Sequence, residues 1–261
     1  MINRIDQLFN EKEGEILSIY ITAGYPGIDD TPRLLKALQK YGADMVEIGI
    51  PFSDPLADGP VIQQSSQLAI KNGMTLNLLF DQLKEIRNSI SIPLVVMGYL
   101  NPILQMGMER FLSKCRDTGI DGVIIPDLPP AEYEKKYKES FSRFGIYHSL
   151  LVTPYTDHKR IERIASLSDG FLYLVAAAST TGAKASLGEQ QQEYFQRIKE
   201  MKLGIPGLIG FGISNRATFL TACKYARGAI IGSAFIKTLG AEISLTLEER
   251  VERFIKDLHI N

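Results

Sequence analysis

Residues 16–50 read ILSIYITAGYPGIDDTPRLLKALQKYGADMVEIGI. The two ends of this stretch, residues 16–22 and 45–50, are short apolar runs rich in β-branched side chains, as expected of strands buried on both faces. Between them, residues 31–41 place their leucines on one helical face and their basic residues on the other. A strand, a helix and another strand in this order predict two parallel strands joined by a right-handed crossover.

The same alternation continues along the chain. Further strand-like runs occupy residues 93–99, 122–127, 147–153, 171–177, 207–212 and 228–232. Helical periodicity occupies residues 75–88, 130–144, 189–201, 216–225, 234–239 and 247–258. Eight strand-like runs that alternate with helices over 261 residues predict a closed (β/α)8 barrel.

A doubly wound open sheet is the rival architecture. The loop after the first strand, AGYPG at residues 23–27, lacks the pattern G-x-G-x-x-G that usually binds a dinucleotide in such a sheet. No linker, charge block or low-complexity run divides the sequence. We therefore expect a single α/β domain over residues 1–261, with a lead-in helix within residues 1–14 and a C-terminal helix within residues 245–261.

The composition argues against several classes of function. With 29 basic and 30 acidic side chains the net charge is −1, whereas nucleic acids and anionic membranes attract a basic excess. No run of about 18 apolar residues predicts a membrane span. Residues 1–15 are too charged for a signal peptide, and two cysteines, Cys115 and Cys223, do not make a disulfide framework. We expect a cytoplasmic protein with neither a nucleic-acid nor a membrane partner.

One carboxylate interrupts an apolar strand. Barrels of this kind carry their chemistry at the carboxyl ends of the strands. Glu47 lies in the run MVEIGI at residues 45–50, where burial would raise the pKa of a lone carboxyl and suit it to general acid catalysis near neutral pH. The alternative is a structural glutamate paired with a buried cation, although the neighbouring strands supply none.

The loop after this strand, PFSDPLADGP at residues 51–60, is stiffened by three prolines that fix φ. Its aspartates, Asp54 and Asp58, thereby have fixed directions, which would suit a carboxylate aimed at a substrate. The alternative is a rigid turn in which they cap backbone N–H groups. Metal binding is less favoured, because no histidine lies close in the sequence.

The last two strands end in glycine, at Gly210-Phe211-Gly212 and at Gly232-Ser233. Bare N–H groups beside a helix N-terminus bind anions, and barrels often hold a phosphate after the seventh and eighth strands. We predict a phosphate site here, the alternative being that the barrel only needs tight turns. The small residues of the stretch 176–188 are typical both of a mobile lid and of a plain surface loop.

These residues together resemble a known family. The stretch EIGIPFSDPLADGP at residues 47–60 is similar to the signature of the tryptophan synthase alpha chain family. Further agreement comes from YITAGYP (20–26), MGYLNP (97–102), PDLP (126–129), GFGIS (210–214) and GSA (232–234). The resemblance implies a TIM barrel and a lyase that cleaves indole-3-glycerol phosphate, by a retro-aldol reaction, to indole and glyceraldehyde 3-phosphate.

The resemblance also implies roles for individual residues. Glu47 would be the acid/base carboxylate and Asp58 would hold the indole N–H, with Thr181 ordering the loop that bears Asp58. Which of the two carboxylates takes the proton of the glycerol hydroxyl stays open. Substrate contacts would come from Tyr20, Met97, Tyr99, Ile124, Leu151, Tyr173 and Phe211, and phosphate contacts from Gly182, Gly212, Gly232 and Ser233.

The family further implies a partner, a separate beta chain that carries pyridoxal phosphate, in an αββα assembly. Asp54, Asn101 and Pro102 would face it, and the lyase step itself needs no metal or organic cofactor. One departure is Ala176-Ala177-Ala178, where the family usually has polar residues, and it bears on how a lid would close. Two other functions stay open: another phosphate-binding barrel enzyme, such as a sugar-phosphate aldolase or isomerase, and a barrel that only activates a beta chain.

Overall fold

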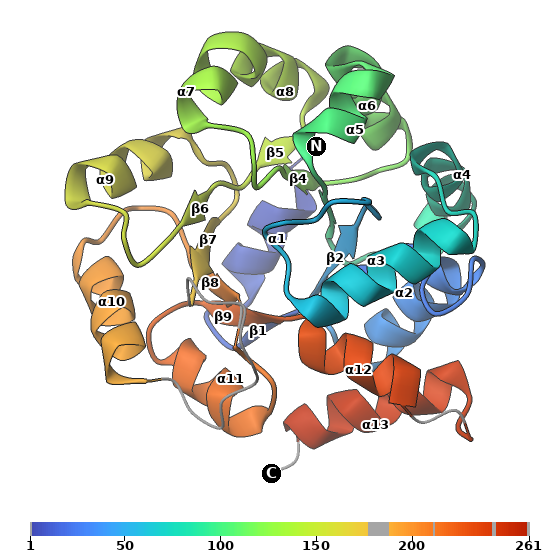
Figure 1. Ribbon diagram of the computed structural model, residues 1–261. Coiled ribbons are helices and arrows are strands. Elements are labelled where there is room, and N and C mark those ends of the chain that lie inside the picture. The colour runs from blue at the N-terminus through green and yellow to red at the C-terminus, as the bar shows by residue number, and fades with distance from the viewer. Residues whose placement is uncertain (1, 177–187, 211, 242–243, 260–261) are drawn as a thin grey trace.

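The computed structural model describes residues 2–176, 188–210, 212–241 and 244–259. Within these residues, nine parallel strand segments form one sheet in the order β5-β4-β3-β2-β1-β9-β8-β7-β6. The segments are β1 (Ile16–Thr22), β2 (Met45–Gly49), β3 (Leu94–Met97), β4 (Gly122–Ile124), β5 (Tyr147–His148), β6 (Leu151–Val152), β7 (Leu172–Val175), β8 (Gly207–Gly210) and β9 (Gly228–Ile231). The sheet curls into a ring with helices around its outside (Figure 1).

The helices follow the strands in the expected alternation. They are α1 (Arg4–Glu11), α2 (Asp30–Tyr41), α3 (Pro60–Lys71), α4 (Leu76–Ile86), α5 (Leu100–Met106), α6 (Met108–Asp117), α7 (Pro130–Glu132), α8 (Lys138–Phe144), α9 (His158–Leu167), α10 (Glu189–Glu200), α11 (Arg216–Cys223), α12 (Ser233–Ala241) and α13 (Leu247–His259). A 3-10 turn, η1 (Arg87–Ser89), and a π-helical turn, η2 (Tyr133–Tyr137), complete the order. None of the helices in the described ranges is long and apolar enough to cross a membrane.

The predicted (β/α)8 barrel is confirmed, with one strand broken in two. The run at residues 147–153 forms β5, which pairs with β4, and β6, which pairs with β7. Between them, the N–H of Ser149 still donates to the carbonyl of Val123 at 3.2 Å. The N–H of Leu150 instead donates to the hydroxyl of Ser168 at 3.1 Å, which takes it out of the strand ladder. Nine segments therefore fill eight positions of the ring.

The other differences concern the ends of predicted elements, one interrupted helix, and the helices α3, α5, α6 and α9, which lie outside the ranges predicted as helical. The observed β3 and β4 stop at Met97 and Ile124, before the predicted ends at 99 and 127, because the last residues of each run leave the ladder to form loops at the carboxyl ends of the strands. The helix predicted over residues 130–144 is interrupted by η2, which the apolar spacing does not reveal. The helices α2 and α8 end at Gly42 and Gly145, whose φ values of 105° and 68° lie in the left-handed region that favours glycine.

Two apolar clusters lie on the two faces of the strands. On β2, Met45 points into the inner cluster, whereas Val46 and Ile48 belong to the outer cluster beneath the helices. Ile5 and Phe9 of α1 also belong to the inner cluster, so α1 fills the barrel at the amino ends of the strands, where it lies across the middle of the ring (Figure 1). The opposite, carboxyl end of the barrel is the end where polar side chains enter.

A histidine is buried in the outer layer. His148 lies between the rings of Tyr133 and Phe141, with centroid separations of 4.2 Å and 5.1 Å. Neither of its ring nitrogens has a hydrogen-bond partner in the described part of the chain. Burial lowers the pKa of His148 from its ordinary 6.5 to about 3, so the folded protein keeps this ring neutral at neutral pH.

This histidine is expected to make the fold acid-sensitive. Below pH 6.5 His148 is protonated in the unfolded chain but stays neutral in the folded chain. The free energy of unfolding therefore falls as the pH falls. On going from pH 7 to pH 5, the free energy of unfolding should fall by about 2 kcal/mol less in His148→Phe than in the parent protein. Urea unfolding at both pH values measures this difference. The exposed His158, changed to Phe, is the control and should leave the pH dependence unaltered. Equal pH dependence in His148→Phe and the parent protein would contradict the prediction.

Candidate functional site

Glu47 lies inside the barrel on β2, two residues after Met45 and nearer to the carboxyl end of the strand. Its side chain is fully buried, and its backbone is in register with Tyr20 of β1 and Val95 of β3. Because side chains alternate along a strand, a residue two positions after an inward-facing Met45 also faces inward. The strand pattern of residues 45–50 thus places one carboxyl group among apolar side chains near the carboxyl end of the barrel.

The surroundings of Glu47 favour its neutral form. Its Oε1 accepts a hydrogen bond from the hydroxyl of Ser18 at 3.4 Å, and its Oε2 has no hydrogen-bond partner among the described residues. Burial raises the pKa of Glu47 to about 8, and the bond from Ser18 lowers it by less. No basic side chain in the described ranges forms an ion pair with Glu47. The geometry therefore favours a general acid over a structural ion pair.

Asp58 is held in the loop after β2. The hydroxyl of Tyr99 donates to its Oδ2 at 3.2 Å, and the same hydroxyl accepts the N–H of Ala57 at 3.0 Å. The ring of Tyr99 stacks on Phe52 at a centroid distance of 5.0 Å. Burial raises the pKa of Asp58 to about 6, against the opposing effect of the Tyr99 bond. At neutral pH Asp58 is therefore mostly ionised while Glu47 is mostly neutral, a division of roles that suits acid/base chemistry.

The rest of this loop is ordered by its own backbone. The N–H of Asp58 donates to the carbonyl of Pro55 at 3.0 Å, and the side chain of Gln63 donates to the carbonyl of Asp58 at 2.9 Å. Asp54 is exposed, and its carboxylate accepts a bond from the adjacent Ser53. The two aspartates therefore differ, since Asp58 turns toward Tyr99 while Asp54 faces solvent.

Two tyrosines lie over glycines inside the barrel. A Cβ atom at Gly49 would lie 1.9 Å from the hydroxyl oxygen of Tyr20, and one at Gly210 would lie 2.3 Å from that of Tyr173. Only glycine leaves room for the phenols at these two strand positions. From the sequence, Gly210 is expected only as part of a glycine end at the phosphate site or of a tight turn, and Gly49 has no predicted role, because the close approach joins residues far apart in the chain.

The phenols of Tyr20 and Tyr173 stay protonated. Burial is the main cause that raises their pKa values, and the nearby carboxylates of Asp58 and Glu47 raise them further. Both tyrosines therefore carry a hydroxyl that can donate a hydrogen bond within a group of tyrosines and carboxylates at the mouth of the barrel.

The predicted apolar contacts come from the same inner surface. Tyr173 and Ile124 belong to the inner cluster, and Tyr20, Met97 and Leu151 pack against it while remaining partly buried. Five residues predicted from separate strands are thus brought together above the apolar interior. Phe211 lies outside the described residues.

The glycine ends of β8 and β9 are neighbours, because these strands pair directly. Gly212 has φ of 77° and open space where a side chain would stand. Gly232 precedes α12, and the N–H of Ile236 donates to the carbonyl of Gly232 at 3.0 Å. Gly182 and Thr181 lie outside the described residues.

The predicted partner contacts lie on α5 and the loop after β2. Asn101 is exposed and Pro102 is partly buried on α5, and Asp54 is exposed on the loop. Two large apolar side chains accompany them, since Leu56 is 88% exposed and Leu104 is 46% exposed.

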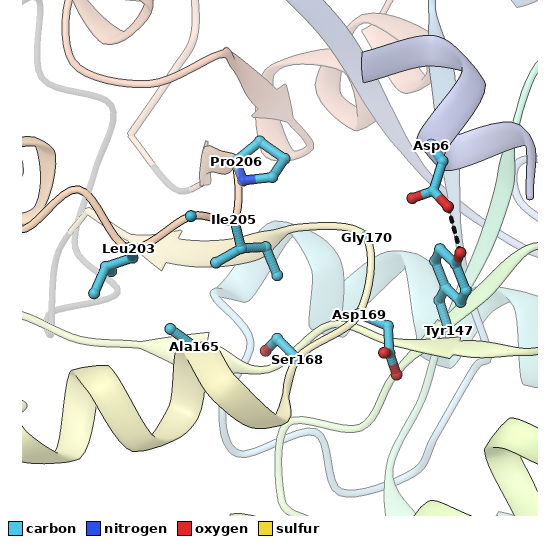
Figure 2. A pocket seen from close by; sticks show the side chains of 10 residues that line it. Asp6, Tyr147, Ala165, Ser168, Asp169, Gly170, Leu203, Ile205 and Pro206 are labelled. Atoms are coloured by element: carbon cyan, nitrogen blue, oxygen red, sulfur yellow. Dashed lines mark hydrogen bonds between the residues drawn. The ribbon is translucent and has the colours of Figure 1, made fainter. Parts of the chain in front are cut away.

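One pocket, of about 410 Å³, lies at the other end of the barrel (Figure 2). Its lining comes from residues that precede β7 and β8, among them Asp169 and Pro206, together with Asp6 of α1, which is hydrogen-bonded to Tyr147. It contains neither Glu47 nor Asp58, so it is separate from the polar group at the carboxyl ends. Among the residues that the structure describes, no three histidines, cysteines or carboxylates are grouped to hold a metal ion.

Known proteins resemble this chain over nearly its whole length. The sequence profile of the family "Tryptophan synthase alpha chain" matches residues 6–259. The tryptophan synthase alpha chain of Flavobacterium psychrophilum is 56% identical over 238 residues, which are 91% of this chain and 94% of that protein. That of Parabacteroides distasonis is 51% identical over 257 residues, 98% of this chain and 99% of the relative.

Solved structures agree with the sequence relatives. The tryptophan synthase alpha chain of Legionella pneumophila superposes with a TM-score of 0.89 at 30% identity, covering 99% of this chain and 96% of that chain. A chain of the tryptophan synthase complex from Pyrococcus furiosus gives a TM-score of 0.84 at 34% identity, covering 93% of this chain and 96% of the other. The match in sequence runs through the strands that carry Glu47, Asp58 and the glycine ends, and the match in structure covers the whole barrel. The chain therefore belongs to the tryptophan synthase alpha chain family.

Proposed function

We propose that Glu47 and Asp58 carry out the acid/base chemistry of this barrel. The chain is a lyase of tryptophan biosynthesis that cleaves indole-3-glycerol phosphate, as its family does. The observation that most supports these roles is that a fully buried Glu47, whose Oε2 has no partner among the described residues, and an Asp58 held by Tyr99 follow one another on β2 and its loop; burial raises the pKa of Glu47 to about 8 and that of Asp58 to about 6. This arrangement provides a proton and a fixed negative charge in the same place.

The first step needs an acid over the indole ring. Protonated Glu47 gives its proton to C3 of the indole, and the ring nitrogen becomes cationic. The bond from C3 to the glycerol chain then breaks, its electrons return to the ring, and the glycerol hydroxyl loses its proton to leave an aldehyde. The proton count balances, because one proton is taken from the enzyme and one is returned. Glu47 and Asp58 are the two carboxylates at the mouth that can accept the returning proton.

Asp58 stabilises the cationic ring. Its carboxylate is fixed by the hydroxyl of Tyr99 and by the stiff loop, so little reorganisation is needed when the charge develops on the ring nitrogen. The charge exists only after C3 has been protonated, and a fixed anion therefore binds the transition state more tightly than the substrate. The apolar residues Met97, Ile124 and Leu151, with the aromatic rings of Tyr20 and Tyr173, provide a surface for the indole.

The phosphate of the substrate is assigned to the glycine ends of the neighbouring strands β8 and β9. Gly212, Gly232 and Ser233 offer backbone N–H groups, and the positive end of the α12 dipole lies beside them. An anion held at this side of the mouth would direct the glycerol chain across the barrel toward Glu47. Gly182 and Phe211 are assigned to the substrate, and Thr181 to the ordering of the Asp58 loop, on the family resemblance alone.

The partner is a tryptophan synthase beta chain. We assign the contact to Asp54, Asn101 and Pro102, together with the exposed Leu56 and Leu104 beside them. The stoichiometry proposed is two alpha and two beta chains, and the proposed location is the cytoplasm. The arrangement is physically reasonable because free indole is apolar enough to cross membranes, so direct transfer between subunits prevents its loss.

Release of indole from indole-3-glycerol phosphate tests the function and the role of Asp58 together. The isolated chain should release indole, and the rate of release should rise when a beta chain is added. Asp58→Asn should lower kcat/KM by about 10²- to 10³-fold, because a neutral amide cannot stabilise the cationic ring. The parent enzyme should lose activity below about pH 6, where Asp58 is protonated, and the variant should lack this decline.

The exposed Asp81 on α4, changed to Asn, is the matched control and should behave as the parent protein. Activation of a beta chain without any release of indole would instead indicate a subunit that has no lyase activity of its own. Turnover of a different sugar phosphate, with none of indole-3-glycerol phosphate, would indicate another barrel enzyme.

A further inference from the structure

Ser18 is a hydroxyl group inside an otherwise apolar barrel. It lies on β1, two residues before Tyr20, and its side chain is fully buried. Its neighbours across the sheet are Met45 of β2 and Ile230 of β9, and both belong to the inner apolar cluster. A buried hydroxyl group that makes no hydrogen bond costs free energy, so the hydroxyl of Ser18 is expected to have a partner.

That hydrogen bond goes to the proposed catalytic acid. Within the described residues the Ser18 side chain makes one hydrogen bond, to Oε1 of Glu47 at 3.4 Å. The register shows the direction: Tyr20 is level with Glu47, so Ser18 lies one inward-facing position deeper in the barrel. The serine therefore holds one oxygen of Glu47 from beneath, while Oε2 is left without a partner in the described part of the chain.

We propose that Ser18 is a positioning residue, which fixes Oε1 of Glu47 from below and leaves Oε2 as the oxygen that exchanges a proton with the substrate. This rests on the role proposed for Glu47. A hydroxyl suits both protonation states, because it can donate to the carboxylate and can accept from the carboxylic acid. The carboxyl group can therefore release and regain its proton without turning away from the ring.

Among the described residues, Ser18 is the group that hydrogen-bonds Oε1. Glu47 raises the pKa values of two nearby phenols, Tyr20 from β1 and Tyr173 from β7, and neither of these groups is a cation. Burial raises the pKa of Glu47, and the bond from Ser18 is the effect that opposes it. Loss of the hydroxyl should therefore leave the carboxyl both less constrained and harder to ionise.

Ser18→Ala tests the proposal by two independent readouts. The first is the titration of Glu47 itself, followed by carbon NMR of protein labelled at the glutamate carboxyls and assigned with Glu47→Gln. The variant should titrate about 0.5 to 1 pH unit higher, because a donor to the charged form has been removed. The second is the pH profile of kcat for indole release, whose Glu47-dependent limb should move by the same amount.

The steady-state parameters separate positioning from a general packing role. Because Ser18 lies one inward-facing position deeper in the barrel than Glu47, we expect kcat to fall about three- to tenfold while KM changes less than twofold. Ser18→Thr keeps the hydroxyl and should recover most of kcat. Ser149 supplies the control, since it is a buried serine that donates to the carbonyl of Asp169 away from the site, and Ser149→Ala should leave the Glu47 titration unchanged.

Different results overturn different statements. If the pKa of Glu47 is the same in Ser18→Ala as in the parent protein, the hydrogen bond from Ser18 does not influence Glu47, and the positioning role is wrong. If the titration moves but the pH profile of kcat stays, Glu47 is not the catalytic acid, and the proposed mechanism fails together with the role of Ser18. A rise in KM at unchanged kcat would show that Ser18 only shapes the cavity.

Discussion

Glu47→Gln is expected to lower kcat for indole release by about 10²- to 10⁴-fold while the protein stays folded. Glutamine has nearly the same shape as glutamic acid but cannot give up a proton near neutral pH. Because burial keeps Glu47 mostly neutral at pH 7, the amide replaces a neutral group and requires no new solvation of a charge. Stopped or initial-rate assays of indole, with far-UV circular dichroism as the measure of folding, provide the test.

The same substitution should make the protein more stable. The pKa of Glu47 is about 8 in the folded chain and 4.5 ordinarily, so between these values the folded chain binds a proton that the unfolded chain releases. The free energy of unfolding consequently falls as the pH rises from 4.5 to 8. Glutamine removes this loss, which amounts to about 3 kcal/mol at pH 7. The gain should vanish below pH 4.5, where Glu47 is protonated in both the folded and the unfolded chain.

Glu139→Gln, on the exposed surface of α8, is the control for both measurements. It should change neither the rate nor the pH dependence of unfolding. Indole release by Glu47→Gln at a rate close to that of the parent enzyme would exclude Glu47 as the proton donor. A loss of activity accompanied by a loss of stability would instead show that Glu47 serves the fold.

Asp121→Ala is expected to destabilise the protein by about 3–5 kcal/mol, the cost of breaking a buried ion pair. Asp121 is 5% exposed and lies just before β4. Its Oδ2 accepts from Arg87 at 2.8 Å and from the N–H of Leu94 at 2.9 Å, while its Oδ1 accepts from Arg4 of α1 at 2.9 Å. One carboxylate thus joins two strands to the helix that fills the lower end of the barrel.

The large cost comes from the charge that remains. Burial lowers the pKa of Arg87 to about 10 although Asp121 raises it, so removing Asp121 leaves a buried guanidinium without the carboxylate that stabilises its charged form. Urea unfolding should show the loss directly, and Tm should fall by roughly 10 °C. Asp117→Ala is the control, because Asp117 pairs with Arg116 on the exposed surface of the same region and should cost less than about 1 kcal/mol.

A double variant shows whether the unpaired charge is the cause. In Asp121→Leu combined with Arg87→Met both charges are replaced by apolar groups, and much of the stability should return. If the double variant is as unstable as Asp121→Ala, the loss of stability comes from the lost hydrogen bonds that Leu94 and Arg4 donate to Asp121, and not from the unpaired charge. A loss below 1 kcal/mol in Asp121→Ala itself would contradict the assignment of a buried ion pair.

Some helices were harder to predict from the sequence than others. On α2 the buried positions are nearly all apolar, which produces a clear periodicity. On α3 two of the buried positions are Ser65 and Ser66, and the hydroxyl of Ser65 bonds to that of Thr22 at 2.7 Å. Polar residues that find partners only in the folded chain weaken the apolar pattern, and α3 was therefore not predicted although Pro60 stands at its first turn.

The candidate site was predicted in part. Glu47 stood out because an acidic residue in an apolar strand is unusual, and Asp58 because prolines surround it. Ser18 and Gly49 gave no such signal, since a serine or a glycine within a strand is ordinary in sequence, and Gly210 pointed only to an anion site or a tight turn. Their importance depends on which side chains approach them across the sheet, as Tyr20 approaches Gly49 and Tyr173 approaches Gly210.

The alternation of strands and helices, and the presence of a carboxyl group on a buried strand, can be predicted from the order of the residues alone. These features follow from backbone preference and from burial, which act between residues close together in the chain. Only the tertiary structure decided that Ser18 lies beneath Glu47, that Tyr99 holds Asp58, and that β5 and β6 share one place in the ring. The physical reason is that such contacts depend on the register between strands and on the closure of the barrel, and both are fixed by the packing of the whole chain.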